Sequence, residues 1–173
     1  MSILELLGLK KPSIKTESPG IENEVLEDIA KELSSLDHQE ALRAAAFAYL
    51  LSRVAYADRE VSEAERIRMS KILQDEAGLS PERAQTVGKM ATQKAKLFGA
   101  VQDYLITREF NKIASHKDKK SLLSAVFSVA AADGIITGAE SRELRQIAAE
   151  LKLDREDYTK LRVAYSDKLE ENK

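Results

Sequence analysis

The chain has 173 residues, of which 43% are hydrophobic and 32% are charged, and its net charge at pH 7 is −2. This slightly acidic balance gives no electrostatic reason to expect nucleic-acid binding, which calls for a strongly basic surface. The chain has no cysteine, which excludes disulfides, thiolate zinc sites and a cysteine nucleophile. Only three prolines and seven glycines, with abundant Ala, Leu, Glu and Lys, predict an all-α fold.

Residues 1–20 read as a terminal segment and linker. Residues 1–9 are mostly apolar, and residues 10–20 are polar with two prolines. We expect residues 1–9 to dock on their own domain, or to contact a partner or, weakly, a membrane surface. This start lacks a basic leader, and no apolar run is long enough to span a bilayer, so we expect a cytoplasmic protein.

The folded domain is expected over residues 21–173. Apolar residues at helical spacing predict a first helix over Ile21–Leu33. The stretches Ala41–Ala57 and Ser121–Ala132 are apolar on nearly all sides. A helix of that kind belongs at the centre of a bundle, so we expect both to be buried.

Each central stretch is followed by an amphipathic helix and then by a third helix. Ser80 and Asp154 are the predicted N-caps of the two third helices. Residues 97–114 read as one further helix between two repeat halves at about 38–97 and 116–166. No alternating strand pattern is present.

One short phrase occurs twice, as VAYADREVSEAE from Val54 to Glu65 and as VAAADGIITGAE from Val129 to Glu140. When Val54 is aligned with Val129, seven of the twenty positions from 54 to 73 are identical, where chance gives one or two. The repetition predicts an internal duplication, in which two three-helix units pack about a pseudo-two-fold axis.

A purely structural role explains each residue of the phrase. Ser62 with Glu65, and Thr137 with Glu140, fit the capping box S/T-x-x-E. Asp58 and Asp133 follow the preceding helices, where a short carboxylate can accept hydrogen bonds from N–H groups of the turn.

A functional role is the alternative. A carboxylate near a helix C-terminus meets the negative end of the helix dipole, so turn amides or a cation must compensate for it. Each corner offers a pair of hard oxygen ligands to Ca²⁺ or Mg²⁺, Asp58 with Glu65 at the first and Asp133 with Glu140 at the second. Neither corner has the residue pattern of an EF-hand. Ca²⁺ takes six to eight oxygens, so further ligands would be needed. Candidates among the nearby acids are Glu60, Glu63 and Glu143.

The second copy of the phrase resembles the TerB-like family, named for a tellurite-resistance protein. The family pattern A-D-G-x-[IV]-x-x-x-E after an Ala-rich helix is matched in full, at Ala132, Asp133, Gly134, Ile136 and Glu140. The first copy matches at Ala57, Asp58, Val61 and Glu65. It has Arg59 where the family usually has Gly, so the pattern does not predict an equivalent turn there.

The resemblance implies a TerB-like helical bundle of seven or eight helices with internal pseudo-two-fold symmetry. It implies a link to tellurite or other stress responses, and a divalent cation, such as Ca²⁺, at acidic residues. We assign those residues as Asp58, Glu65, Asp133 and Glu140. Related domains are attached to other modules, including a DnaJ-type co-chaperone, which implies a protein partner.

Three functional hypotheses follow. The first is a non-enzymatic module that binds a divalent cation and a protein partner. The second is a metal-free interaction scaffold, in which the acids serve only as helix caps. The third is an enzyme with a carboxylate-bound metal, which we do not favour because the sequence offers no candidate nucleophile or base. The two histidines, His38 and His116, lie outside the repeated corners.

Overall fold

The protein is described by a computed structural model, which covers residues 29, 31–98 and 103–172. Within these residues the chain forms eight helices and no strand, so the predicted all-α fold of seven or eight helices is confirmed. The helices are α3 (His38–Ala55), α4 (Glu63–Asp75), α5 (Pro81–Phe98), α6 (Asp103–Ile113), α7 (His116–Ala130), α8 (Gly138–Glu150), α9 (Arg155–Ala164) and the short 3₁₀ helix η2 (Glu170–Asn172).

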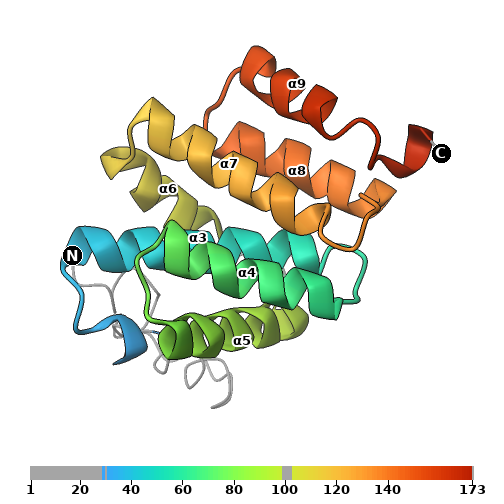
Figure 1. Cartoon of the computed structure of the whole chain (residues 1–173). Coiled ribbons are helices and arrows are strands. Elements are labelled where there is room, and N and C mark those ends of the chain that lie inside the picture. The colour runs from blue at the N-terminus through green and yellow to red at the C-terminus, as the bar shows by residue number, and fades with distance from the viewer. Residues whose placement is uncertain (1–28, 30, 99–102, 173) are drawn as a thin grey trace, which may run out of the picture.

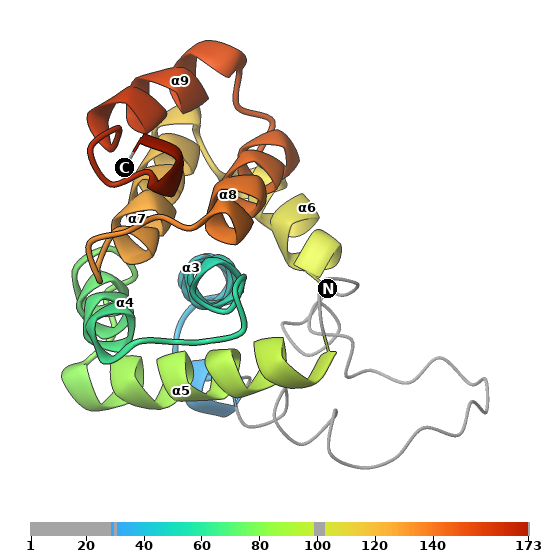
Figure 2. The ribbon, with the colours of Figure 1, turned by 90° about the vertical axis from the view of Figure 1, so that its right-hand side faces the viewer.

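Helix α3 is the centre of the bundle. Figure 2 shows it end-on, with α4, α5, α6, α7 and α8 arranged around it. Its side chains from Ala44 to Ala55 are all buried, as its apolar sequence predicts. Many of these residues are alanines, which allow neighbouring backbones to approach closely. The helix begins after Asp37, whose carboxylate accepts hydrogen bonds from the N–H groups of Gln39 and Glu40.

The other helices lie in layers on both sides of α3. In Figure 1 these run from α9, through α7 and α8, to α3 and α4, and end with α5. Helices α4 and α8 are of equal length and begin at equivalent positions of the two copies of the repeated phrase. Each buries the apolar face predicted for it. These residues are Met69, Ile72 and Leu73 on α4, and Leu144, Ile147 and Ala148 on α8, followed by Leu151 at its C-terminus.

The third helices begin as the sequence predicts. Helix α5 starts at Pro81, and the Ser80 hydroxyl accepts a hydrogen bond from the Arg83 N–H. Helix α9 starts after Asp154, whose carboxylate accepts a hydrogen bond from the Asp157 N–H at 2.8 Å. Helix α5 has 18 residues and α9 only 10, so the two halves differ most at their third helix.

The single helix predicted over residues 97–114 is wrong. Helix α5 extends through Phe98, and α6 is a separate helix from Asp103. Both segments are rich in helix formers, so periodicity could not locate the boundary between them. Ile106 and Phe110 of α6 are buried in the core.

The predicted terminal segment at 1–20 lies outside the described residues, as does most of the helix predicted at Ile21–Leu33. Of that helix, Ile29 and Leu33 are fully buried in the core. The boundaries of the domain and of the repeat halves stay predictions. None of the described helices is both long and apolar enough to cross a bilayer.

Candidate functional site

The first corner connects α3 to α4. Asp58 accepts a hydrogen bond from the Glu60 N–H on its Oδ1 atom, at 3.1 Å. Arg59 adopts a left-handed backbone conformation with φ of 72°. The first corner therefore makes a tight turn without the glycine that the family usually has here, at the cost of a conformation that side chains other than Gly, Asn and Asp seldom adopt.

The second corner connects α7 to α8 and repeats these features. Asp133 accepts a hydrogen bond from the Ile135 N–H on its Oδ1 atom, at 3.0 Å. Gly134, the counterpart of Arg59, has φ of 100°. The two turns thus share one hydrogen-bond pattern, in which the carboxylate that follows the helix is held by a backbone amide of the turn.

Both corners end in a complete capping box. Ser62 donates its N–H to Glu65 Oε2 at 2.7 Å, and the Ser62 hydroxyl accepts from the Glu65 N–H at 3.1 Å. Thr137 and Glu140 make the same two bonds at 2.7 and 3.2 Å. The structural role proposed for these residues from sequence is therefore present at both corners.

The second corner has an additional cover from the C-terminal segment. Ile136 donates its N–H to the Lys168 carbonyl at 2.8 Å, and the Glu170 N–H returns a bond to the Ile136 carbonyl at 3.0 Å. The Glu170 carboxylate also accepts a hydrogen bond from the Gly138 N–H, at the start of α8. Leu169 is buried beside them, so this segment closes the second corner.

The acids of the two corners lie near one another. Burial raises the pKa of Glu140 to about 8, against the hydrogen bonds from Thr137, and the charges of Glu65 and Asp58 raise it further. Burial likewise raises the pKa of Glu65, and Asp133 and Asp58 add to the effect. All four predicted site residues therefore interact electrostatically, across the two halves as well as within them.

Burial divides these acids into an inner and an outer pair. Glu65 and Glu140 are only 4% and 3% exposed, whereas Asp58 and Asp133 are exposed. Among the ion pairs of the described residues, none joins any of the four to a lysine or an arginine. The group therefore carries negative charge that the surrounding side chains do not balance.

A family model described as "Tellurite resistance protein TerB" matches residues 43–163. The chain belongs to the TerB family. The match spans both corners and most of the core, which confirms the resemblance found in the sequence. No curated protein and no solved structure matches the chain.

The four acids of this TerB domain fit a divalent cation in charge and donor type, because hard cations prefer carboxylate oxygen. They do not form a full set of ligands. Within the described residues, no group of three or more acidic, histidine or cysteine side chains is placed to hold a metal ion. A cation here would have one or two protein carboxylates and would keep water as its other ligands.

The further ligands considered from sequence do not join the group. Glu143 pairs with Arg53, and Glu63 pairs with Arg66. Glu60 is exposed and only donates its N–H to Asp58. These contacts leave the four corner acids as the candidate site.

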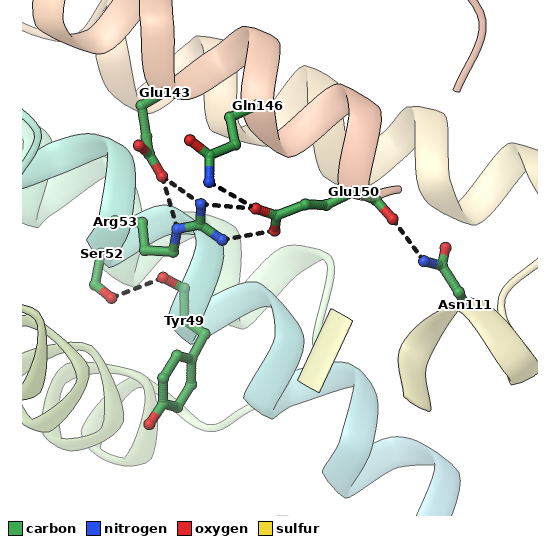
Figure 3. Close-up of polar contacts among 7 residues, drawn as sticks. All are labelled: Tyr49, Ser52, Arg53, Asn111, Glu143, Gln146 and Glu150. Carbon is green, nitrogen blue, oxygen red and sulfur yellow. Dashed lines mark hydrogen bonds and ion pairs between the residues drawn. The ribbon is translucent and has the colours of Figure 1, made fainter. Parts of the chain in front are cut away.

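A buried ionic cluster beside the corners was not predicted from the sequence (Figure 3). The Arg53 side chain, 6% exposed, donates to Glu143 at 2.6 Å and forms a bidentate pair with Glu150 at 2.7 and 3.1 Å. Gln146 donates to Glu150, and Asn111 of α6 donates to the Glu150 carbonyl. Burial acts to raise the pKa of Glu150, but its bonds to Arg53 outweigh this, and the net shift is downward. The only sequence signal was Arg53 itself, one of two arginines in the largely apolar stretch Ala41–Ala57.

The Arg53 contact has a weaker counterpart in the other half. The alignment of the two copies of the repeat places Arg53 opposite Ser128 and Arg68 opposite Glu143. Arg53 of α3 binds Glu143 of α8, and Arg68 of α4 binds Ser128 of α7. Such reciprocity is what a two-fold relation between the halves requires. The internal duplication itself stays a prediction.

Arg43 and Asp118 form a contact of another kind. They occupy equivalent positions of the two halves and bind each other directly, with Arg43 Nη1 and Asp118 Oδ1 at 2.8 Å. The Ser115 hydroxyl and the Arg43 guanidinium lower the pKa of Asp118 to about 2. Two positions related by the repeat therefore meet face to face, as residues beside a two-fold axis do.

Proposed function

We propose that this TerB domain is a non-enzymatic, cytoplasmic module that binds a hydrated divalent cation between its two corners and a protein partner at another surface, in a tellurite-type stress response. The observation that carries the proposal is the unbalanced charge of the corner acids. Burial raises the pKa of both buried glutamates, Glu65 and Glu140. The charge of Asp58 raises both values further, Asp133 adds to the effect at Glu65, and Glu65 adds to it at Glu140.

The chemistry of the site favours a cation that keeps its water. Mg²⁺ is commonly bound through one or two carboxylates plus several waters, whereas Ca²⁺ takes six to eight oxygens. Asp58 and Asp133 are exposed and each holds its turn through Oδ1. Their Oδ2 atoms, for which no hydrogen bond is recorded in the described part of the chain, are the groups we assign to the cation and its waters.

Cation binding should compete with a proton. With a pKa of about 8, Glu140 is mostly protonated at pH 7 in the cation-free protein. A nearby divalent cation favours the ionised carboxylate, so binding should release a proton from this group.

Calorimetric titration with Mg²⁺, Ca²⁺, Mn²⁺ and Zn²⁺ tests the proposal. Runs in two buffers of different ionisation enthalpy measure the released proton. We expect Asp133→Asn to abolish the heat of binding. The control variant Asp167→Asn changes an exposed acid of the C-terminal segment and should leave the heat of binding unchanged. The absence of heat and of any thermal shift with all four ions would reject the cation site.

The second candidate is a metal-free scaffold, and the complete capping boxes favour it. Every one of the four acids already accepts a hydrogen bond from the backbone without a metal ion. On this alternative, Asp133→Asn lowers stability to the same extent with and without a chelator. A large fall in melting temperature of the wild type on chelation would exclude it.

The non-enzymatic part of the proposal rests on the position of the histidines. His38 and His116 are the first residues of α3 and α7, whereas the corners follow the last turns of these helices. Helix α7, the shorter of the two, is about 22 Å long at a rise of 1.5 Å per residue, so no imidazole lies beside the corner acids. A turnover that is lost in both Asp58→Ala and Asp133→Ala, with the fold intact, would overturn this part.

A further inference from the structure

A groove with a volume of about 660 Å³ runs between α4 and α5. Its walls are two stripes at helical spacing, one from Glu63 to Gln74 on α4 and one from Ala84 to Lys96 on α5. Each stripe covers about 17 Å at a rise of 1.5 Å per residue. The groove is therefore as long as three turns of a helix.

The floor and one edge of the groove are apolar. Met69 and Ala84 line it from the core. Gly88 lines it as well. A Cβ atom at Gly88 would meet Leu73 Cδ1 of α4 at 3.5 Å, so the glycine lets the two helices pack closely beneath the groove. Ile67 lies in the same lining and is 63% exposed. An exposed isoleucine on a concave surface is typical of a binding site rather than of a free helix face.

The edges of the groove are basic. Four basic side chains line it, which are Arg66 and Lys71 on α4 and Lys89 and Lys96 on α5. Among the described residues, the lining contains a single acid, Glu63. The chain as a whole has a net charge of −2, so this concentration of positive charge is local.

The ion pairs within the groove do not neutralise it. Arg66 pairs with Glu63, and Lys71 pairs with Asp75, through contacts between exposed side chains of one helix. Such exposed pairs contribute little to stability and are easily exchanged. Lys89 and Lys96 form no ion pair with any described residue, and they lie seven positions apart, on one face of α5.

We propose that the α4–α5 groove is the docking site for an acidic amphipathic helix of a partner protein. The apolar face of such a helix would cover Ile67 and the floor, and its acidic flanks would meet Lys89 and Lys96. Charge complementarity and the length of the groove select this occupant. A concave groove fits a cylinder, whereas a lipid surface would need a flat or convex basic face. This inference rests on the partner-binding part of the proposed function and not on the cation site.

Fluorescence anisotropy with the full 173-residue chain tests the proposal. The probe is a labelled helical peptide of about four turns, with leucines along one face and glutamates on both flanks. The control peptide has lysines in place of the glutamates. We expect a Kd on the order of 10 μM for the acidic peptide, at least tenfold weaker binding of the basic one, and weakening with added salt.

Matched variants locate the site. The double variant Lys89→Glu, Lys96→Glu should bind the acidic peptide at least tenfold more weakly than the wild type. The control double variant Lys117→Glu, Arg145→Glu, at exposed positions of α7 and α8, should bind it as the wild type does. Ile67→Ser should weaken binding, and Val163→Ser, at a residue of α9 that is 65% exposed, should leave it unchanged. All these side chains are at the surface, so the variants should fold, and circular dichroism melting verifies it.

Three outcomes would overturn the proposal. These are equal binding of both peptides, undiminished binding by the Lys89 and Lys96 double variant, and no binding at all. Sedimentation that shows self-association dependent on these lysines would assign the groove to a second copy instead. Lysine-dependent binding of phosphatidylserine vesicles, without peptide binding, would assign it to a membrane. Cation titration of the same double variant keeps the two proposals separate, because it should match the wild type.

Discussion

The two corners build the same turn but close it differently. At the first corner, Arg59 adopts a left-handed backbone conformation and the described chain adds no cover. At the second, Gly134 adopts that conformation without strain, and the segment around Leu169 lies over the turn. The hydrogen bonds of Asp58 and Asp133 therefore define the turn at both corners. The glycine and the C-terminal cover adjust its stability, while the acids of the two corners are buried to the same extent.

The contacts between the halves are unequal in burial, and breaking the buried one should change stability the most. Arg53→Met leaves Glu150 without its buried partner, so we expect a loss of about 3–5 kcal/mol in the free energy of unfolding. Arg68→Met removes the exposed counterpart contact to Ser128 and should cost about 0–1 kcal/mol. Urea denaturation of both variants at pH 7 measures the difference. Losses of equal size would mean that the buried cluster does not hold the halves together.

The next effect is on the pH dependence of stability. Because the folded-state pKa of Glu140 is raised from 4.5 to about 8, the folded protein holds its proton more tightly than the unfolded chain. Stability from this group is therefore present below pH 4.5 and is lost as pH rises to 8, by about 4 kcal/mol.

Glu140→Gln tests this pH dependence, because glutamine keeps the capping box but cannot ionise. Urea midpoints from pH 5 to 8, measured with chelator, should fall in the wild type and stay nearly level in Glu140→Gln. Glu65→Gln is the matched variant at the uncovered corner. We expect it to flatten the pH dependence of the urea midpoint in the same direction, but by less than Glu140→Gln does. A wild type and a Glu140→Gln variant with parallel profiles would contradict the raised pKa.

Substitutions at the second position of each turn should have opposite signs. Gly134→Ala places a methyl group at φ of 100°, and we expect a loss of about 1–3 kcal/mol. Arg59→Gly removes the backbone strain of an arginine at φ of 72°. We expect a gain of about 0.5–1 kcal/mol in the free energy of unfolding, less the entropy that glycine adds to the unfolded chain. Thermal melts of both variants measure the two changes in stability. A destabilised Arg59→Gly would mean that a contact of the Arg59 side chain stabilises the fold by more than the backbone strain costs.

The smallest effect should be the same at both corners. Ser62→Ala and Thr137→Ala each remove the cap hydroxyl that accepts the N–H of the glutamate three residues on, and Thr137→Ala also removes a bond from that hydroxyl to Glu140 Oε2. We expect about 1 kcal/mol for each. Chemical denaturation of the two variants should agree within error, and a clear excess at Thr137 would show that the C-terminal cover strengthens its cap.

The sequence predicted what depends on local pattern. Capping boxes, N-caps and the buried faces of α4 and α8 follow from spacing of a few residues, and the structure has them at Ser62, Thr137, Ser80 and Asp154. A turn at Arg59 equivalent to that at Gly134 was not predicted, because arginine rarely adopts a positive φ. The neighbouring hydrogen bonds of the corner impose it.

Contacts between distant parts of the chain could not be predicted. The Arg53 cluster joins residues 90 and 97 positions apart, and nothing in either local sequence names the partner. The meeting of the corner acids across the halves, and the cover over Ile136, are also long-range. The boundary between α5 and α6 was missed for a different reason, since both sides favour helix equally well.

The pairing of Arg43 with Asp118 has a consequence for how the halves recognise one another. If two copies of the first half associated in the same geometry, arginine would stand against arginine, and two copies of the second would oppose aspartate to aspartate. Like charges at that distance repel, so only the mixed arrangement is satisfied. Separately expressed fragments should therefore assemble as a heterodimer, and this single position discourages each half from pairing with a second copy of itself.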